Sequence, residues 1–153
     1  MPLITEEIRN FVNQQKLAYV ATVCPDGTPN LSPKGTIRAW DNEHLVFADI
    51  HSPGTVENLR LNPSIEINMV DIFRRKGYRF KGKAEVLSSG SKFNELVAAY
   101  GDSAKKFNIR NIIIVNVEQV IPVWSPAYDD GTTEEIIVKG WIQYWQEIYP
   151  KID

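Results

Sequence analysis

Residues 18–35 read AYVATVCPDGTPNLSPKG, and this stretch decides the fold. Its first six residues, 18–23, are mostly apolar or β-branched, which favours a β-strand. The Pro-Asp-Gly sequence at residues 25–27 is a strong turn signal, because proline fixes one backbone angle and glycine tolerates a positive one. A second extended run follows over residues 29–39. We therefore expect a β-hairpin over residues 17–39.

Short strand patterns continue along the rest of the chain and are separated by turn residues. We expect further strands at residues 44–48, 64–70, 78–87, 111–117 and 119–124. Many short strands with only local connections favour an antiparallel barrel over a doubly wound parallel sheet. The sequence therefore predicts a mainly β fold with flanking helices.

Helix signals flank these strands. Thr5 is a suitable N-cap for a first amphipathic helix that ends near Gln15. We expect Thr55 to cap a short helix that Asn62 and Pro63 end, because the residue before a proline disfavours helical geometry. A third helix is expected to stop at Gly101.

The C-terminal part of the chain, about residues 125–153, is rich in aromatic residues. Its large apolar residues recur on one helical face, although Gly140 weakens the helix by ~1 kcal/mol. These residues are Ile137, Trp141, Tyr144, Trp145 and Ile148. Because such a face is costly to expose, we expect it to pack on the barrel or on a partner subunit, where it would also roof the site.

Length and composition describe one ordinary globular domain over residues 1–153. Hydrophobic residues make up 43% and charged residues 24%, so a disordered chain is not expected. The 17 basic and 19 acidic residues give a net charge of −2, which argues against binding to nucleic acid or to an anionic membrane surface. The single cysteine, Cys24, cannot form an internal disulfide, and no apolar stretch is long enough to span a membrane. We therefore expect a cytoplasmic protein.

Three stretches together resemble a known family. They are the hairpin at residues 18–35, the segment LVFAD at 45–49 leading to TVENLRLNP at 55–63, and YRFKGKAEV at 78–86, which has the form Arg-x-x-Gly-x-Ala. In this order and spacing they are similar to the pyridoxamine 5′-phosphate oxidase-like family of split barrels that bind flavin mononucleotide (FMN). The similarity covers roughly residues 5–124.

The resemblance implies a six-stranded Greek-key barrel and a homodimer that holds FMN non-covalently in a groove where the subunits meet. It also implies that the second hairpin strand runs beside the flavin ring. The loop that follows Asp49 would reach the ribityl chain and the phosphate. The expected cofactor-binding residues are Ser32, Pro33, Lys34, Gly35, Asp49, Ser52, Gly54, Thr55, Asn58, Arg79 and Trp124.

The chemistry of FMN supports this choice of residues. A phosphate dianion is bound by cationic side chains, hydroxyl groups and the free N–H groups at the start of a helix. Lys34 is the first choice for the cation, with a solvated surface lysine as the alternative. Asp49 and Asn58 would bond the ribityl hydroxyls or brace the loop. Arg79 would approach the cofactor or remain a solvated strand charge.

Trp124 would cover the flavin or lie in the core or at a subunit interface.

The sequence also departs from the oxidase itself. The oxidase itself carries adjacent basic residues where this chain has Gly54 and Thr55, and a C-terminal Arg-x-His pattern that is absent here. We therefore do not expect pyridoxamine 5′-phosphate oxidase activity, and a deazaflavin or haem stays open. His44 and His51 lack partners at metal-ligand spacing, so no metal site is expected.

Three hypotheses of function remain. The first is an FMN-dependent oxidoreductase that acts on a small organic molecule, although no catalytic acid or base and no substrate are indicated by the sequence. The second is a non-catalytic carrier or sensor of flavin, deazaflavin or haem. A third reading is a binding module on the same barrel that has lost its cofactor.

Overall fold

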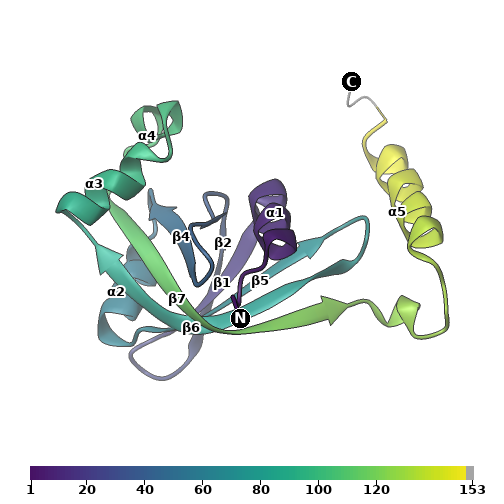
Figure 1. Cartoon of the computed structure of the whole chain (residues 1–153), viewed down its shortest axis with the longest axis horizontal. Coiled ribbons are helices and arrows are strands. Elements are labelled where there is room, and N and C mark those ends of the chain that lie inside the picture. Colours follow the sequence, from purple (N-terminus) through teal and green to yellow (C-terminus); the bar gives the residue numbers. More distant parts are fainter. Residues whose placement is uncertain (151–153) are drawn as a thin grey trace.

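Seven antiparallel strands form one curled sheet in the computed structural model, which describes residues 1–150 (Figure 1). Their order across the sheet is β2-β1-β5-β6-β7-β4-β3. In chain order the strands are β1 (Ala18–Val23), β2 (Pro29–Lys34), β3 (Arg38–Ala39), β4 (His44–Asp49), β5 (Ser64–Asp71), β6 (Lys76–Leu87) and β7 (Asn111–Trp124).

The two edges of the sheet are formed by neighbouring pieces of chain. β2 pairs with β1 at one edge, and β3 pairs with β4 at the other, yet only residues 35–37 separate them. The sheet must therefore curl until its edges approach each other, which makes it a split barrel. The expected fold class is confirmed. The structure has seven strands where the resemblance implied six: the run predicted over residues 29–39 divides at Gly35, where the chain crosses from one edge of the sheet to the other, and the runs predicted at residues 111–117 and 119–124 join into one strand.

Five α-helices and one 3₁₀ turn accompany the sheet. They are α1 (Glu6–Gln15), α2 (Pro53–Leu61), α3 (Ser91–Ala98), α4 (Asp102–Lys106), the 3₁₀ turn η1 (Pro126–Tyr128) and α5 (Glu134–Ile148). The predicted cap of the first helix is confirmed, since the Thr5 hydroxyl accepts a hydrogen bond from the Ile8 N–H (3.3 Å). The sequence missed α4, which begins directly after Gly101.

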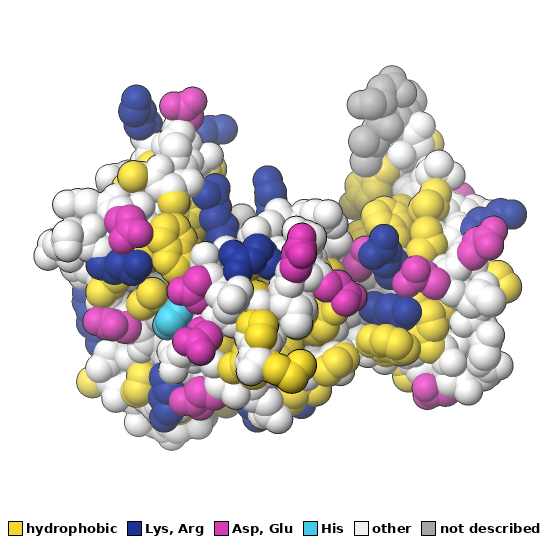
Figure 2. Space-filling model, viewed as in Figure 1, with side chains coloured by type: hydrophobic (Ala, Val, Ile, Leu, Met, Phe, Trp, Pro, Cys, Tyr) yellow, Lys and Arg dark blue, Asp and Glu magenta, His cyan; other side chains and the backbone are white. Residues whose placement is uncertain are grey.

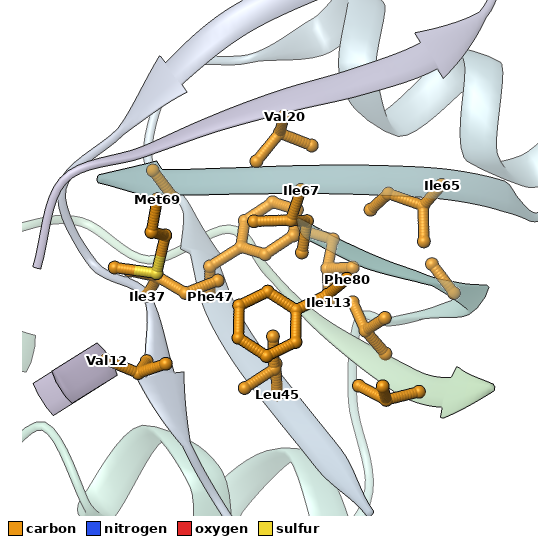
Figure 3. Close-up of a cluster of buried hydrophobic side chains, with 14 of the residues drawn as sticks. Val12, Val20, Ile37, Leu45, Phe47, Ile65, Ile67, Met69, Phe80 and Ile113 are labelled. Atoms are coloured by element: carbon orange, nitrogen blue, oxygen red, sulfur yellow. The ribbon is translucent and has the colours of Figure 1, made fainter. Parts of the chain in front are cut away.

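The barrel core is filled by inward side chains from both halves of the sheet and by α1 (Figure 3). The strand predicted over residues 78–87 is confirmed as part of β6, where side chains alternate: Phe80 is fully buried and its neighbours Arg79 and Lys81 are exposed. The other labelled core residues in Figure 3 are Val12, Val20, Ile37, Leu45, Phe47, Ile65, Ile67, Met69 and Ile113.

The long pair β6–β7 contains a close approach of two backbones. β7 is continuous where the sequence predicted two strands. A bulge at Glu118 lies at the point where the two were expected to meet, since Lys81 pairs with Gln119 and Gly82 with Val117. A Cβ added at Gly82 would lie 2.1 Å from the carbonyl oxygen of Asn116. Only glycine fits this close approach of two backbones.

Beyond β7 the chain forms what we call the arm, residues 125–150. The phenol of Tyr128 donates to the carbonyl of Arg74 (2.6 Å), and the guanidinium of Arg75 lies 3.4 Å from the centre of the Trp141 ring. These contacts hold the arm to the turn between β5 and β6. In Figure 1 α5 stands apart from α1 and the barrel, so within one chain it does not pack on the barrel or roof it. Within residues 1–150 no helix is both long and apolar enough to cross a lipid bilayer.

Candidate functional site

A buried lysine lies at the centre of the candidate site. Lys34 is the last residue of β2, and only 8% of its surface is exposed. Its ammonium group donates hydrogen bonds to the hydroxyls of Ser32 (2.9 Å) and Ser52 (2.8 Å). Lysine is rarely buried without a charged partner. Lys34 is therefore not the solvated surface lysine that the sequence left open.

The N-terminus of α2 meets Lys34. Ser52 is the N-cap of this helix, but its hydroxyl makes no capping bond and instead accepts from Lys34. The prediction that Thr55 caps the helix was wrong, because the helix begins earlier, at Pro53. Thr55 is buried, and its hydroxyl lies 3.3 Å from that of Ser32.

These groups together suit an anion. The first-turn N–H groups of α2, including those of Gly54 and Thr55, have no acceptor within the helix. They add the positive end of a helix dipole to one ammonium and three hydroxyl groups. We call this set the Lys34 pocket: Ser32, Lys34, Ser52, Gly54 and Thr55.

Asp49 braces the loop that leads into the pocket. One carboxylate oxygen accepts from the Ser52 N–H (2.8 Å), and the other accepts from the Asn111 side chain (2.8 Å). Burial lowers the pKa of Lys34, and the negative charge of Asp49 acts in the opposite direction. A bound anion would act in the same sense as Asp49, because it also favours the charged ammonium.

Asn58 has a bracing position as well. It lies on the buried face of α2, and its amide donates to the Thr22 hydroxyl of β1 (3.0 Å). The Asn58 side chain thus holds α2 against the sheet and donates to β1 and Cys24, not to a side chain of the Lys34 pocket.

The backbone next to Lys34 is accessible. Gly35 and Gly54 are both exposed, and a Cβ added at either would meet no atom within 4 Å. Pro33 is exposed on β2, alternating with the inward Ser32 and Lys34. A ligand can therefore approach the main chain on both sides of the Lys34 ammonium.

A groove of about 610 Å³ begins at Gly35 and runs between α1, β3 and the α3–α4 segment. Burial raises the pKa of Tyr100 in its wall to about 12, so this phenol stays neutral at pH 7, and it donates to the carbonyl of Thr36 (2.8 Å). The guanidinium of Arg38 lies 4.2 Å from the centre of the Tyr100 ring. The lining residues, which include no carboxylate, are Asn13, Lys16, Gly35, Thr36, Ile37, Arg38, Ala39, Trp40, Ala99, Tyr100, Ser103 and Phe107.

The sequence did not indicate this groove. Arg38 and Trp40 follow Lys34 in the same chain segment, so their proximity was the one available signal. The approach of Tyr100 and Phe107 depends on how α3 and α4 fold back on the sheet. No local pattern encodes that contact.

Two expected site residues lie away from the Lys34 pocket. Arg79 is exposed on β6 and pairs with Glu66 (2.9 Å). Trp124, 60% exposed, is at the end of β7, where the Lys76 ammonium lies 4.1 Å from the centre of its ring. Neither residue contacts the pocket within one chain. No group of three metal-ligating side chains is placed to hold a metal in the described part of the chain.

Comparison with known proteins gives one family and a set of similar structures. The family model described as "Pyridoxamine 5'-phosphate oxidase" matches residues 4–124. The crystal structure of HupZ from Group A Streptococcus has 34% sequence identity and a TM-score of 0.70, covering 80% of this chain and 95% of HupZ.

Two further structures share the fold at lower identity. An FMN-binding protein from Syntrophomonas wolfei is 15% identical, with a TM-score of 0.65 over 76% of this chain and 84% of its own. An F420 reductase is 20% identical, with a TM-score of 0.56 over 74% of this chain and 94% of its own. The arm lies beyond the residues that the family model matches.

Proposed function

Because this chain belongs to the pyridoxamine 5′-phosphate oxidase family, we propose that it binds FMN non-covalently, with the phosphate in the Lys34 pocket. One observation carries the proposal: the Lys34 ammonium is held by Ser32 and Ser52 at the N-terminus of α2. This arrangement supplies positive charge, hydroxyl groups and free N–H groups, which are what a phosphate dianion requires. The residues present therefore fit the phosphate of FMN.

The groove next to the pocket suits the rest of the cofactor and a substrate. Flavin needs an apolar slot with hydrogen-bonding groups along its edge. Tyr100, Phe107 and Trp40 supply the apolar surface, and the accessible backbone at Gly35 supplies polar groups.

We assign the protein as an FMN-dependent oxidoreductase for a small molecule. The bound flavin would supply the hydride or electron transfer, while the protein binds and orients the reactants. Lys16 and Arg38 line the groove without a carboxylate, which favours a substrate that carries negative charge. Pyridoxamine 5′-phosphate is not proposed as that substrate, because it needs a second basic cluster for its own phosphate and the Arg-x-His pattern expected for it is not found in this sequence.

We further propose a cytoplasmic homodimer in which the flavin lies near the subunit contact. Support comes from the outer face of the β1–β2 hairpin, where Leu17, Tyr19 and Leu31 are exposed. The Lys34 pocket belongs to β2, an edge strand of the sheet, so a partner can reach it.

The alternative is a carrier or sensor of a flavin, a deazaflavin or haem. Two observations favour this alternative. Both carboxylate oxygens of Asp49 accept hydrogen bonds within the chain, and the Tyr100 phenol stays neutral. These two groups are then poor candidates for proton transfer. The similarity in fold to an F420 reductase makes the deazaflavin worth testing, because that ligand also carries a phosphate group.

The test is a fluorescence titration of the purified protein with FMN and, separately, with riboflavin, which lacks the phosphate. We expect Lys34→Ala and the volume-conserving Lys34→Met to weaken FMN binding roughly 10- to 150-fold, as expected for a lost charge-assisted contact worth ~1.5–3 kcal/mol. Riboflavin binding should change little in both variants. Lys105→Ala, which removes an exposed lysine of α4, is the matched control.

The outcomes separate the alternatives. An equal loss of FMN and riboflavin would place the phosphate elsewhere. No binding of FMN by the native protein, with saturable binding of F420 or haem, would replace the cofactor. A tightly bound FMN that no electron acceptor reoxidises faster than free flavin would favour the carrier.

A further inference from the structure

The apolar face of α5 continues beyond the contacts that anchor it. Ile137, in the first half of the helix, is buried, and Trp141 is covered by Arg75. Residues spaced three or four apart share one side of a helix, so Tyr144 and Ile148 extend the same face. No segment within residues 1–150 covers this second half.

The uncovered half of the arm is a substantial apolar surface. Ile142, Tyr144, Ile148 and Tyr149 are between 41% and 52% exposed. At ~150–250 Å² for a large side chain, they present roughly 350 Å² of surface. A contiguous patch of this size is typical of an interaction site. In Figure 2 hydrophobic side chains gather on the arm, which is separated from the barrel by a notch.

A second exposed apolar patch lies on the outer face of the β1–β2 hairpin. Leu17, Tyr19 and Leu31 are 48% to 65% exposed. Pro33 joins them, since it is exposed and pairs with Tyr19 across the two strands. Residues 1–150 thus present two apolar patches that no described segment covers.

Charged side chains surround both patches. Glu135 and Glu147 are exposed on α5, where Lys139 is the one basic residue. On the sheet, β6 turns Arg79, Lys81, Lys83 and Glu85 outward, and Glu66 and Glu118 lie beside them. Glu66 pairs with Arg79 and Lys81, and no ion pair of Lys83 is recorded among residues 1–150. The charges of the sheet therefore balance, so the match between arm and sheet is one of apolar surface, with the Lys83 ammonium available to an arm carboxylate.

We propose that the arm binds a second copy of this chain, with α5 of each copy lying on the outer face of the partner's β1–β2 hairpin. A twofold axis makes this contact twice, so each copy contributes an arm and a sheet patch. Together these approach the ~800 Å² per partner of a standard stable interface. The acidic arm does not suit an anionic membrane surface. The proposal rests on the homodimer of the proposed function and assigns its contact to a segment outside the family match.

The first test is the mass of the full-length protein by sedimentation equilibrium. We expect the native chain to be a dimer and Ile142→Lys/Ile148→Lys to be at least 10-fold weaker in self-association. Both isoleucines are exposed, so the fold should persist, which circular dichroism checks. Gln143→Lys/Gln146→Lys adds the same charge to exposed positions between them and is the matched control. A native monomer, or a dimer that resists the isoleucine changes, overturns the proposal.

The second test locates the contact. Equal amounts of ¹⁴N- and ¹⁵N-labelled native protein are mixed, and carboxylates are coupled to amines with a zero-length carbodiimide cross-linker. We expect mixed-isotope peptides that join Glu135 or Glu147 to Lys81 or Lys83. Mixed peptides that join arm to arm, or links within one isotope only, contradict the assigned surface.

Flavin binding keeps the two proposals apart. FMN and riboflavin titrations are repeated on the isoleucine variant. A native monomer whose FMN affinity depends on Lys34 would remove the arm contact and leave the phosphate site standing. A native dimer that depends on Ile142 and Ile148 but binds no FMN would remove the phosphate site and leave the arm contact standing.

Discussion

The barrel and the arm differ in how far they bury their apolar side chains. In the barrel, Phe47 and Phe80 are fully buried by strands from the same chain. In the second half of the arm, Ile142 and Ile148 remain exposed. The barrel is thus stabilised by its own packing, whereas the arm is held mainly through the turn between β5 and β6.

The same difference holds for polar groups. The Lys34 pocket buries an ammonium group inside the barrel, although burial disfavours its charge. The arm exposes apolar surface to water. Each arrangement is unfavourable in an isolated chain and becomes favourable when a particular partner binds. For the pocket we propose a phosphate, and for the arm a second copy of the chain.

The largest expected effect is on the barrel. Gly82→Ala places a Cβ 2.1 Å from the carbonyl oxygen of Asn116, and this contact can be relieved only by moving the backbone. We expect a loss of roughly 3 kcal/mol in the free energy of unfolding, measured with urea. Gly54→Ala, where an added Cβ meets no atom within 4 Å, is the control. Equal stabilities of the two variants would show that β6 and β7 are less tightly packed than the structure indicates.

A smaller effect concerns the charge in the pocket. Because burial lowers the pKa of Lys34, the folded protein binds this proton less tightly than the unfolded chain does. The penalty is full below the lowered pKa and disappears as the pH rises towards 10.5, the ordinary value. We therefore expect the native protein to gain stability relative to Lys34→Met between neutral pH and about pH 10.5, measured by urea unfolding at several pH values. Lys105→Met, at an exposed position of α4, is the control, and a parallel trend in it would contradict the prediction.

The sequence predicted those parts of the molecule that local patterns determine. The Pro-Asp-Gly turn, the Thr5 cap and the strand around Phe80 all rest on neighbouring residues, and the structure confirms each. Lys34, Ser32 and Ser52 were named as one site through a resemblance in motif order, and the structure brings them together.

The rest depends on contacts between distant segments. The break at Gly35 follows from the curl of the whole sheet, which sends β2 and β3 to opposite edges. The Tyr100 side of the groove requires α3 and α4 to fold back. Trp124 was grouped with the flavin because of its position in the motif order, but within one chain it packs against Lys76 and Tyr128. Its distance from Lys34 could not be read from spacing along the chain.

The smallest expected effect is on the arm. Gly140 lies in the exposed interior of α5, and a Cβ added there meets no atom within 4 Å. Gly140→Ala should stabilise the helix by ~1 kcal/mol. At concentrations where the protein is monomeric, we expect about 5-fold slower amide hydrogen exchange within α5. The urea midpoint of the barrel should not move, since the arm is anchored to the turn between β5 and β6 and not to the barrel core. A shift of that midpoint that corresponds to the full ~1 kcal/mol in the free energy of unfolding would mean that arm and barrel unfold as one unit. The two regions would then differ only in how much apolar surface they expose.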